Sequence, residues 1–138
     1  MRTWAALIFA CLAVFLLAAC GGTGGTASTD CTASMEYIAD VTIPDNTVLK
    51  PGERFVKTWR VKNDGTCPWD GYRLTLVQGD AMTDANQPVP KVQPGEEAEL
   101  SIPMTAPADA GSYAASWQME TRAAEGFGQL IVSIQVEP

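Results

Sequence analysis

The sequence of 138 residues contains no histidine. Histidine is the commonest general base, proton shuttle and zinc ligand near neutral pH, so its absence excludes serine–histidine and cysteine–histidine catalysis. Acid–base chemistry would then need paired carboxylates, such as Asp40 with Asp45, and no spacing in the sequence marks them as a catalytic pair. We therefore do not expect an enzyme.

Basic residues are also scarce, with nine Lys and Arg against sixteen Asp and Glu and a net charge of −7. Contacts to phosphate groups need clustered Lys and Arg, so we do not expect a nucleic-acid partner. Most of the basic residues fall in one stretch: Lys50, Arg54, Lys57, Arg60 and Lys62. We interpret this basic stripe as a solvated sheet face paired with Glu97, Glu99 and Glu120. The alternative is contact with an acidic partner or with anionic lipid headgroups.

Metal ligands are few as well. Of the four cysteines, only Cys31 and Cys67 lie beyond the N-terminal apolar run, and two cysteines without histidine do not complete a tetrahedral zinc shell. Asp80, Asp84 and Asn86 lie in one polar loop, but the glycine and closing glutamate of an EF-hand are missing. We expect no metal and no other cofactor.

A long apolar run occurs at the N-terminus, from Trp4 to Cys20 after Arg2. It is shorter than the roughly 20 residues of a membrane-spanning helix and has the shape of a secretory signal. Its last four residues, Leu17 to Cys20, resemble the lipobox of bacterial lipoproteins, in which the cysteine is diacylated. This pattern predicts a signal peptide over 1–19, lipidation of Cys20 and display on the outer face of a bacterial membrane. The alternatives are an uncleaved signal anchor, or an ordinary signal with a cysteine near the cut.

Residues 20–30 form a Gly/Ser/Thr-rich segment typical of a flexible linker, with a reach of roughly 17–19 Å. Cys31 and Cys67 then remain in the domain over 31–138. An even pair in an exported domain suggests a disulfide that stabilises by roughly 4 kcal/mol. The alternative is two free buried thiols.

From Cys31 onward the apolar residues alternate with polar ones, and turn signals recur about every ten residues. No amphipathic helix is evident. The pattern predicts an all-β, immunoglobulin-like sandwich of about seven antiparallel strands. The strands are expected near 35–43, 47–49, 55–62, 72–78, 89–92, 98–104, 113–119 and 130–136.

Several motifs in this region match one known family: D-V-T-I-P-D from Asp40, P-G-E from Pro51, K-T-W-R-V-K-N from Lys57 and G-T-C-P-W from Gly65. They resemble the four-tryptophan (FW) immunoglobulin-like domain of Nbr-type (next to BRCA) autophagy receptors, which also occurs in bacterial lipoproteins. The resemblance covers roughly Asp40 to Val136 and implies a protein-interaction module. A cysteine pair common in the bacterial branch supports the Cys31–Cys67 disulfide.

Three of the family's four tryptophans carry over, as Trp59, Trp69 and Trp117, while isoleucine stands near the fourth position, at about Ile131. Alternation with apolar neighbours predicts that Trp59 and Trp117 lie in the core. Trp69 lies in a turn-rich loop, where it either caps the sandwich or serves as an exposed anchor. As an anchor it would form a contact site with Tyr72 and Arg73.

The sequence is compatible with three functions. The first is a membrane-anchored protein-interaction module. The second is a carbohydrate or envelope-polymer binder, because sugar sites place exposed aromatic rings beside carboxylates and amides, as Trp69, Asp70 and Tyr72 would. The third is a purely structural envelope lipoprotein.

Overall fold

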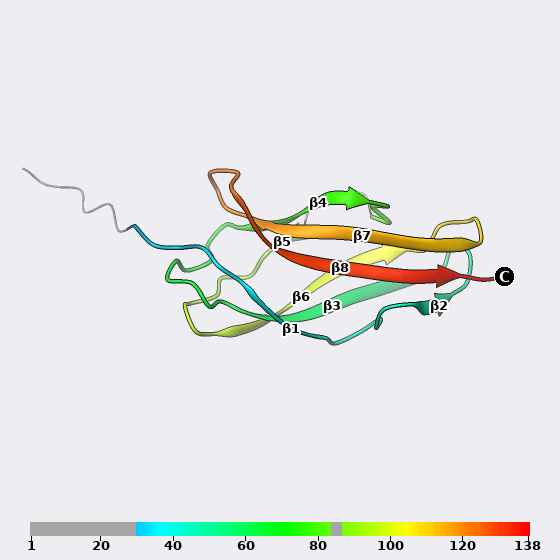
Figure 1. Ribbon diagram of the computed structural model, residues 1–138, viewed down its shortest axis with the longest axis horizontal. Coiled ribbons are helices and arrows are strands. Elements are labelled where there is room, and N and C mark those ends of the chain that lie inside the picture. The colour runs from blue at the N-terminus through cyan, green and yellow to red at the C-terminus, as the bar shows by residue number, and fades with distance from the viewer. Residues whose placement is uncertain (1–29, 84–86) are drawn as a thin grey trace, which may run out of the picture.

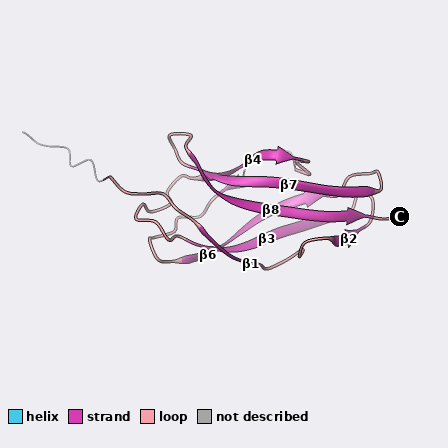
Figure 2. Ribbon diagram, viewed as in Figure 1, coloured by secondary structure: helices cyan, strands magenta, loops and turns pink. Residues whose placement is uncertain are grey.

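The computed structural model describes residues 30–83 and 87–138 (Figure 1). The expected signal segment, Cys20 and the linker up to residue 29 lie outside the described residues, and so do Asp84 and Asn86 of the polar loop. Every regular element of the described part is a strand (Figure 2). Their bounds are β1 Glu36–Asp40, β2 Thr47–Leu49, β3 Arg54–Lys62, β4 Arg73–Gly79, β5 Gln87–Pro88, β6 Glu97–Thr105, β7 Gly111–Glu120 and β8 Gly126–Val136.

The strands form two layers, which confirms the expected sandwich. One sheet has the order β1-β3-β6 and the other the order β2-β8-β7-β4-β5. The strand expected near 89–92 is shifted to β5, and Val92 makes only an isolated bridge to Trp69. Pro90 interrupts the expected strand, because proline has no N–H to donate to a ladder.

One strand pairing is parallel, where antiparallel pairing was expected. Thr47 of β2 lies opposite Ile134 of β8, and the two strands run in the same direction (Figure 1). The reason is the segment 41–46, which carries the chain from the first sheet to the second without a reversing hairpin. We call it the crossing segment. Ile43 and Asn46 within it have φ values of 49° and 64°.

Trp59 and Trp117 lie in the core at 0% and 1% exposure, as predicted. The Trp59 indole also links the two sheets, because its Nε1 donates a hydrogen bond of 2.9 Å to the Ile131 carbonyl. Ile131 lies in the half of β8 that precedes its pairing with β2. The bond therefore satisfies a carbonyl that would otherwise face an open sheet edge.

The predicted disulfide is present, with the Cα atoms of Cys31 and Cys67 4.9 Å apart. Backbone bonds reinforce it, because the amides of Thr66 and Cys67 donate to the Thr32 carbonyl at 2.9 and 3.1 Å. The neighbouring Gly65 packs so closely that a Cβ there would lie 2.3 Å from the same carbonyl. The start of the domain is thus fastened at the end of the sandwich where the chain enters (Figure 1).

Candidate functional site

Trp69 is fully buried, so its interpretation as an exposed anchor is wrong. Its exposure is 0%, and its ring centroid lies 6.4 Å from that of Phe127. Its backbone exchanges hydrogen bonds of 2.9 and 3.1 Å with Val92. These contacts hold the indole as a cap on the end of the sandwich, and a partner would not reach it without local unfolding.

Tyr72 and Arg73 do not form a contact surface with Trp69. Tyr72 is half-buried with its ring edge against Phe127, at a centroid distance of 5.8 Å. Arg73 points from the exposed face of β4 and pairs with Glu120. Because Trp69 is buried, the alternative sugar site at Trp69, Asp70 and Tyr72 lacks an accessible indole ring.

Asp70 is also engaged in ion pairs. Its carboxylate accepts a hydrogen bond of 2.8 Å from Arg122 and lies 3.4 Å from the Lys91 ammonium. This end of the sandwich therefore presents a carboxylate that is already neutralised by two cations.

The expected basic stripe does not form one face, because its members in β3 are divided between the two faces of that strand. Arg60 is exposed and pairs with Glu99 at 2.8 Å, and this hydrogen bond and charge raise the pKa of the Arg60 guanidinium. The interpretation as a solvated face fits this pair. It is wrong for Lys57, whose side chain is 0% exposed. The alternation of Phe55, Lys57 and Trp59 along the strand was the signal that places Lys57 in the core.

An open pocket of about 280 Å³ lies on the side of the sandwich where β1 faces β8. We call it the edge pocket, and it is lined by Tyr37, Asp40, Asp45, Gln129 and Ile131. Tyr37 and Ile131 are each 48% exposed. The pocket thus combines an aromatic ring, two carboxylates, an amide and an apolar side chain on an accessible surface.

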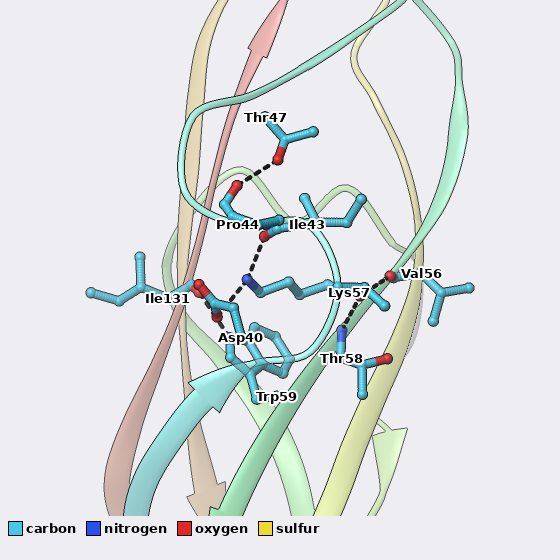
Figure 3. A network of polar contacts seen from close by, with 10 residues as sticks. Asp40, Ile43, Pro44, Thr47, Val56, Lys57, Thr58, Trp59 and Ile131 are labelled. Atoms are coloured by element: carbon cyan, nitrogen blue, oxygen red, sulfur yellow. Dashed lines mark hydrogen bonds and ion pairs between the residues drawn. The ribbon is translucent and has the colours of Figure 1, made fainter.

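The charge of the edge pocket comes from its two aspartates. Asp40 is 19% exposed and lies 2.7 Å from the buried Lys57 ammonium, which neutralises it (Figure 3). Asp45 is exposed and forms no ion pair with any described residue. Desolvation raises the pKa of the Tyr37 phenol most, followed by the charge of Asp40 and a side-chain hydrogen bond with it. A backbone hydrogen bond at Asp40 lowers the pKa of Tyr37, and the charge of Asp45 makes the smallest contribution to raising it. The pocket therefore carries net negative charge at neutral pH.

Within the described ranges, no three His, Cys, Asp or Glu residues lie close enough together to hold a metal ion. The polar loop with Asp80, Asp84 and Asn86, which lacks the pattern of a calcium site, includes residues outside the described ranges, so the structure does not test it. Nor do these ranges include a helix of the length and apolarity needed to cross a membrane.

The sequence profile described as "Ig-like domain from next to BRCA1 gene" matches residues 42–136. The chain belongs to this family. Protein ILRUN of Danio rerio is 37% identical over 109 residues, which are 77% of this chain and 38% of that protein. Protein JOKA2 of Solanum tuberosum is 32% identical over 73% of this chain and 12% of its own length. The human Next to BRCA1 gene 1 protein is 29% identical over 78% of this chain and 12% of its own. The chain thus spans much less than two thirds of the length of each of these relatives.

Among solved structures, a Niemann-Pick type C2 protein from the Japanese carpenter ant superposes with a TM-score of 0.50 and 8% identity, over 77% of this chain and 96% of that one. This likeness concerns the sandwich fold alone. Ile131, near which the sequence resemblance leads us to expect the family's fourth tryptophan, lines the edge pocket.

Proposed function

We propose that this chain is a non-catalytic protein-interaction module that contacts its partner at the edge pocket. The observation that carries the proposal is the exposed, unpaired Asp45 carboxylate beside an accessible aromatic ring. Further exposed apolar side chains, Ile38 and Val41, lie next to the pocket along the chain. Protein interfaces commonly join such an aromatic and apolar centre to a few polar groups. Membership of the family supports this class of function.

The pocket chemistry favours a basic group on the partner. Asp45 attracts a guanidinium or ammonium, while Tyr37 offers a ring face for a cation–π contact. Ile131 and the neighbouring apolar residues would cover the aliphatic part of such a side chain. We infer a partner segment that carries a lysine or arginine between apolar residues.

Replacing Asp45 by asparagine removes this charge while keeping the shape of the side chain. We expect about fivefold weaker binding of a capped Val-Arg-Val peptide, because an exposed charge contact contributes on the order of 1 kcal/mol. The measurement is an NMR titration that follows backbone amides. Asp70→Asn is the matched control, since Arg122 and Lys91 already occupy that carboxylate. Equal weakening by both variants, or shifts confined to the disulfide end, would contradict the proposal.

A carbohydrate site is the second candidate, and the same pocket favours it. Tyr37, Asp45 and Gln129 place an aromatic ring beside a carboxylate and an amide, which is the combination typical of sugar sites. A glycan array separates the two candidates, because only a sugar binder gives a signal that Asp45→Asn reduces there. No binding in either assay, together with an envelope defect on deletion, would favour the structural lipoprotein.

We further propose that the module is exported and tethered to the outer face of a membrane by lipid on Cys20. The lipobox-like sequence supports this anchor, and the disulfide is consistent with an oxidising compartment. Two or three acyl chains would hold the protein durably, whereas one binds only marginally. The short linker would keep the domain near the bilayer.

Cys20→Ala is expected to move the protein from the membrane fraction to the soluble fraction, because it removes the site of acylation. Fractionation followed by immunoblotting measures the distribution. Cys11→Ala is the control, since it changes the other cysteine of the apolar run and leaves the lipobox intact. Retention of the Cys20 variant in the membrane fraction would refute the lipid anchor.

A further inference from the structure

Lys57 is a buried lysine on the core-facing side of β3. Removing an ammonium from water is costly unless oxygen atoms replace its hydration. Lys57 Nζ lies 2.7 Å from Asp40 Oδ1 and 2.7 Å from the Ile43 carbonyl oxygen (Figure 3). It also lies 5.5 Å from the ring centroid of Trp59. These groups take the place of water around the charge.

The two oxygen partners of Lys57 flank the start of the crossing segment. Asp40 ends β1, and Ile43 adopts a φ of 49°, which a β-branched residue rarely does. Such a conformation costs on the order of 1–3 kcal/mol and persists only where surrounding contacts impose it. Lys57 supplies one of these contacts. Thr42 supplies others, because its Oγ1 accepts a hydrogen bond of 2.8 Å from the Thr58 amide and donates one of 2.6 Å to the Val56 carbonyl.

Stability alone does not account for a lysine at this position. A buried ion pair is often no more stabilising than apolar residues of similar volume. An apolar side chain would fill the same space but would bind neither Asp40 nor Ile43. Both lie in the short stretch that also carries Asp45 into the edge pocket.

We propose that Lys57 is a positioning residue for the edge pocket, whose ammonium holds the crossing segment so that Asp40 and Asp45 remain beside Tyr37. The inference rests on the proposed function, in which this pocket is the contact site. It assigns the buried lysine a role in binding although no partner touches it.

Asp40 and Asp45 contribute to the raised pKa of Tyr37 after desolvation by burial, so a change in this pKa reports movement of the two aspartates without any ligand. Lys57→Met removes the ammonium and keeps a side chain of similar length. If Lys57 holds the segment, Asp40 and Asp45 move away in the variant, and the pKa of Tyr37 falls toward its ordinary value of 10.0. If the aspartates stay in place, the loss of a neighbouring positive charge raises the Tyr37 pKa further, because negative charge disfavours the phenolate. A fall supports the inference, and an unchanged or higher pKa overturns it.

The titration is followed by ¹³C NMR of the tyrosine rings in a Tyr72→Phe, Tyr113→Phe background, so that Tyr37 alone is observed. Lys50→Met, an exposed lysine in the turn after β2, is expected to leave the Tyr37 pKa unchanged. Lys57→Gln is titrated in parallel. Its amide still donates one hydrogen bond, so we expect a smaller fall in the Tyr37 pKa. If the methionine variant does not fold, the direction of the Tyr37 pKa shift in Lys57→Gln decides whether the inference holds.

Binding of the Val-Arg-Val peptide separates this inference from the proposed function. We expect Lys57→Met to weaken peptide binding at least tenfold and Lys50→Met to leave it unchanged. A fall in the Tyr37 pKa with no peptide binding to the wild-type chain would overturn the pocket's function and leave the role of Lys57 intact. If the wild-type chain binds the peptide and Lys57→Met binds it equally tightly, the inference about Lys57 is overturned and the pocket's function stands.

Discussion

Replacing Trp69 by alanine is expected to lower the free energy of unfolding by about 3–5 kcal/mol, which is typical for a buried tryptophan or phenylalanine. The indole is fully enclosed and packs near Phe127, so its removal leaves a cavity that the end of the sandwich fills only in part. Chemical denaturation monitored by circular dichroism measures the change. The loss is large for a domain whose total stability is on the order of 5–15 kcal/mol.

Two further variants give this measurement its controls. Trp69→Phe keeps an aromatic ring, and it costs less because the indole N–H has no hydrogen-bond partner among the described residues. Arg73→Ala changes an exposed neighbour and is expected to change stability by less than about 1 kcal/mol. A Trp69→Ala variant as stable as the wild-type protein would contradict burial of the ring and restore the exposed anchor.

Removing the disulfide is the second large effect that we expect. The Cys31→Ser, Cys67→Ser variant should lose about 2–5 kcal/mol, because the bond closes a loop with a sequence separation of 36 residues. β1, β2 and β3 all lie within that loop. Denaturation midpoints of the variant and of the reduced wild-type protein measure the loss.

The loss of stability should also be uneven along the chain. Because the bond fastens the segment before β1, amides of β1 are expected to lose hydrogen-exchange protection before those of β7, which is central in its sheet. Equal stability with and without the bond would contradict its structural role. So would a uniform loss of protection in every strand.

Alternation of apolar residues predicted the long strands well. β3, β6, β7 and β8 all follow it, because each buries one face against the other sheet. The same rule placed Trp59 and Trp117 in the core. The direction of β2 was not predictable in this way, since a segment of three residues has too little pattern to show which edge it joins.

The candidate site was harder to predict, for two physical reasons. Trp69 lies in a loop, where no periodicity distinguishes a buried ring from an exposed one. The edge pocket brings Tyr37 and Asp45 together with Ile131, which is remote in sequence and meets them only across the gap between the two sheets. The family motif D-V-T-I-P-D was the one available signal, because it begins at Asp40 and ends at Asp45.

The central claim is that a protein partner docks at the edge pocket, and site-specific photo-cross-linking in intact membranes tests it most directly. A benzoylphenylalanine at Ile131, which is 48% exposed, is compared with one at Val56, which is 49% exposed on the outer face of β3. We predict a discrete protein adduct at position 131 that Asp45→Asn diminishes, and none at position 56. An adduct at position 56 alone, or one at position 131 that Asp45→Asn leaves unchanged, would contradict the account.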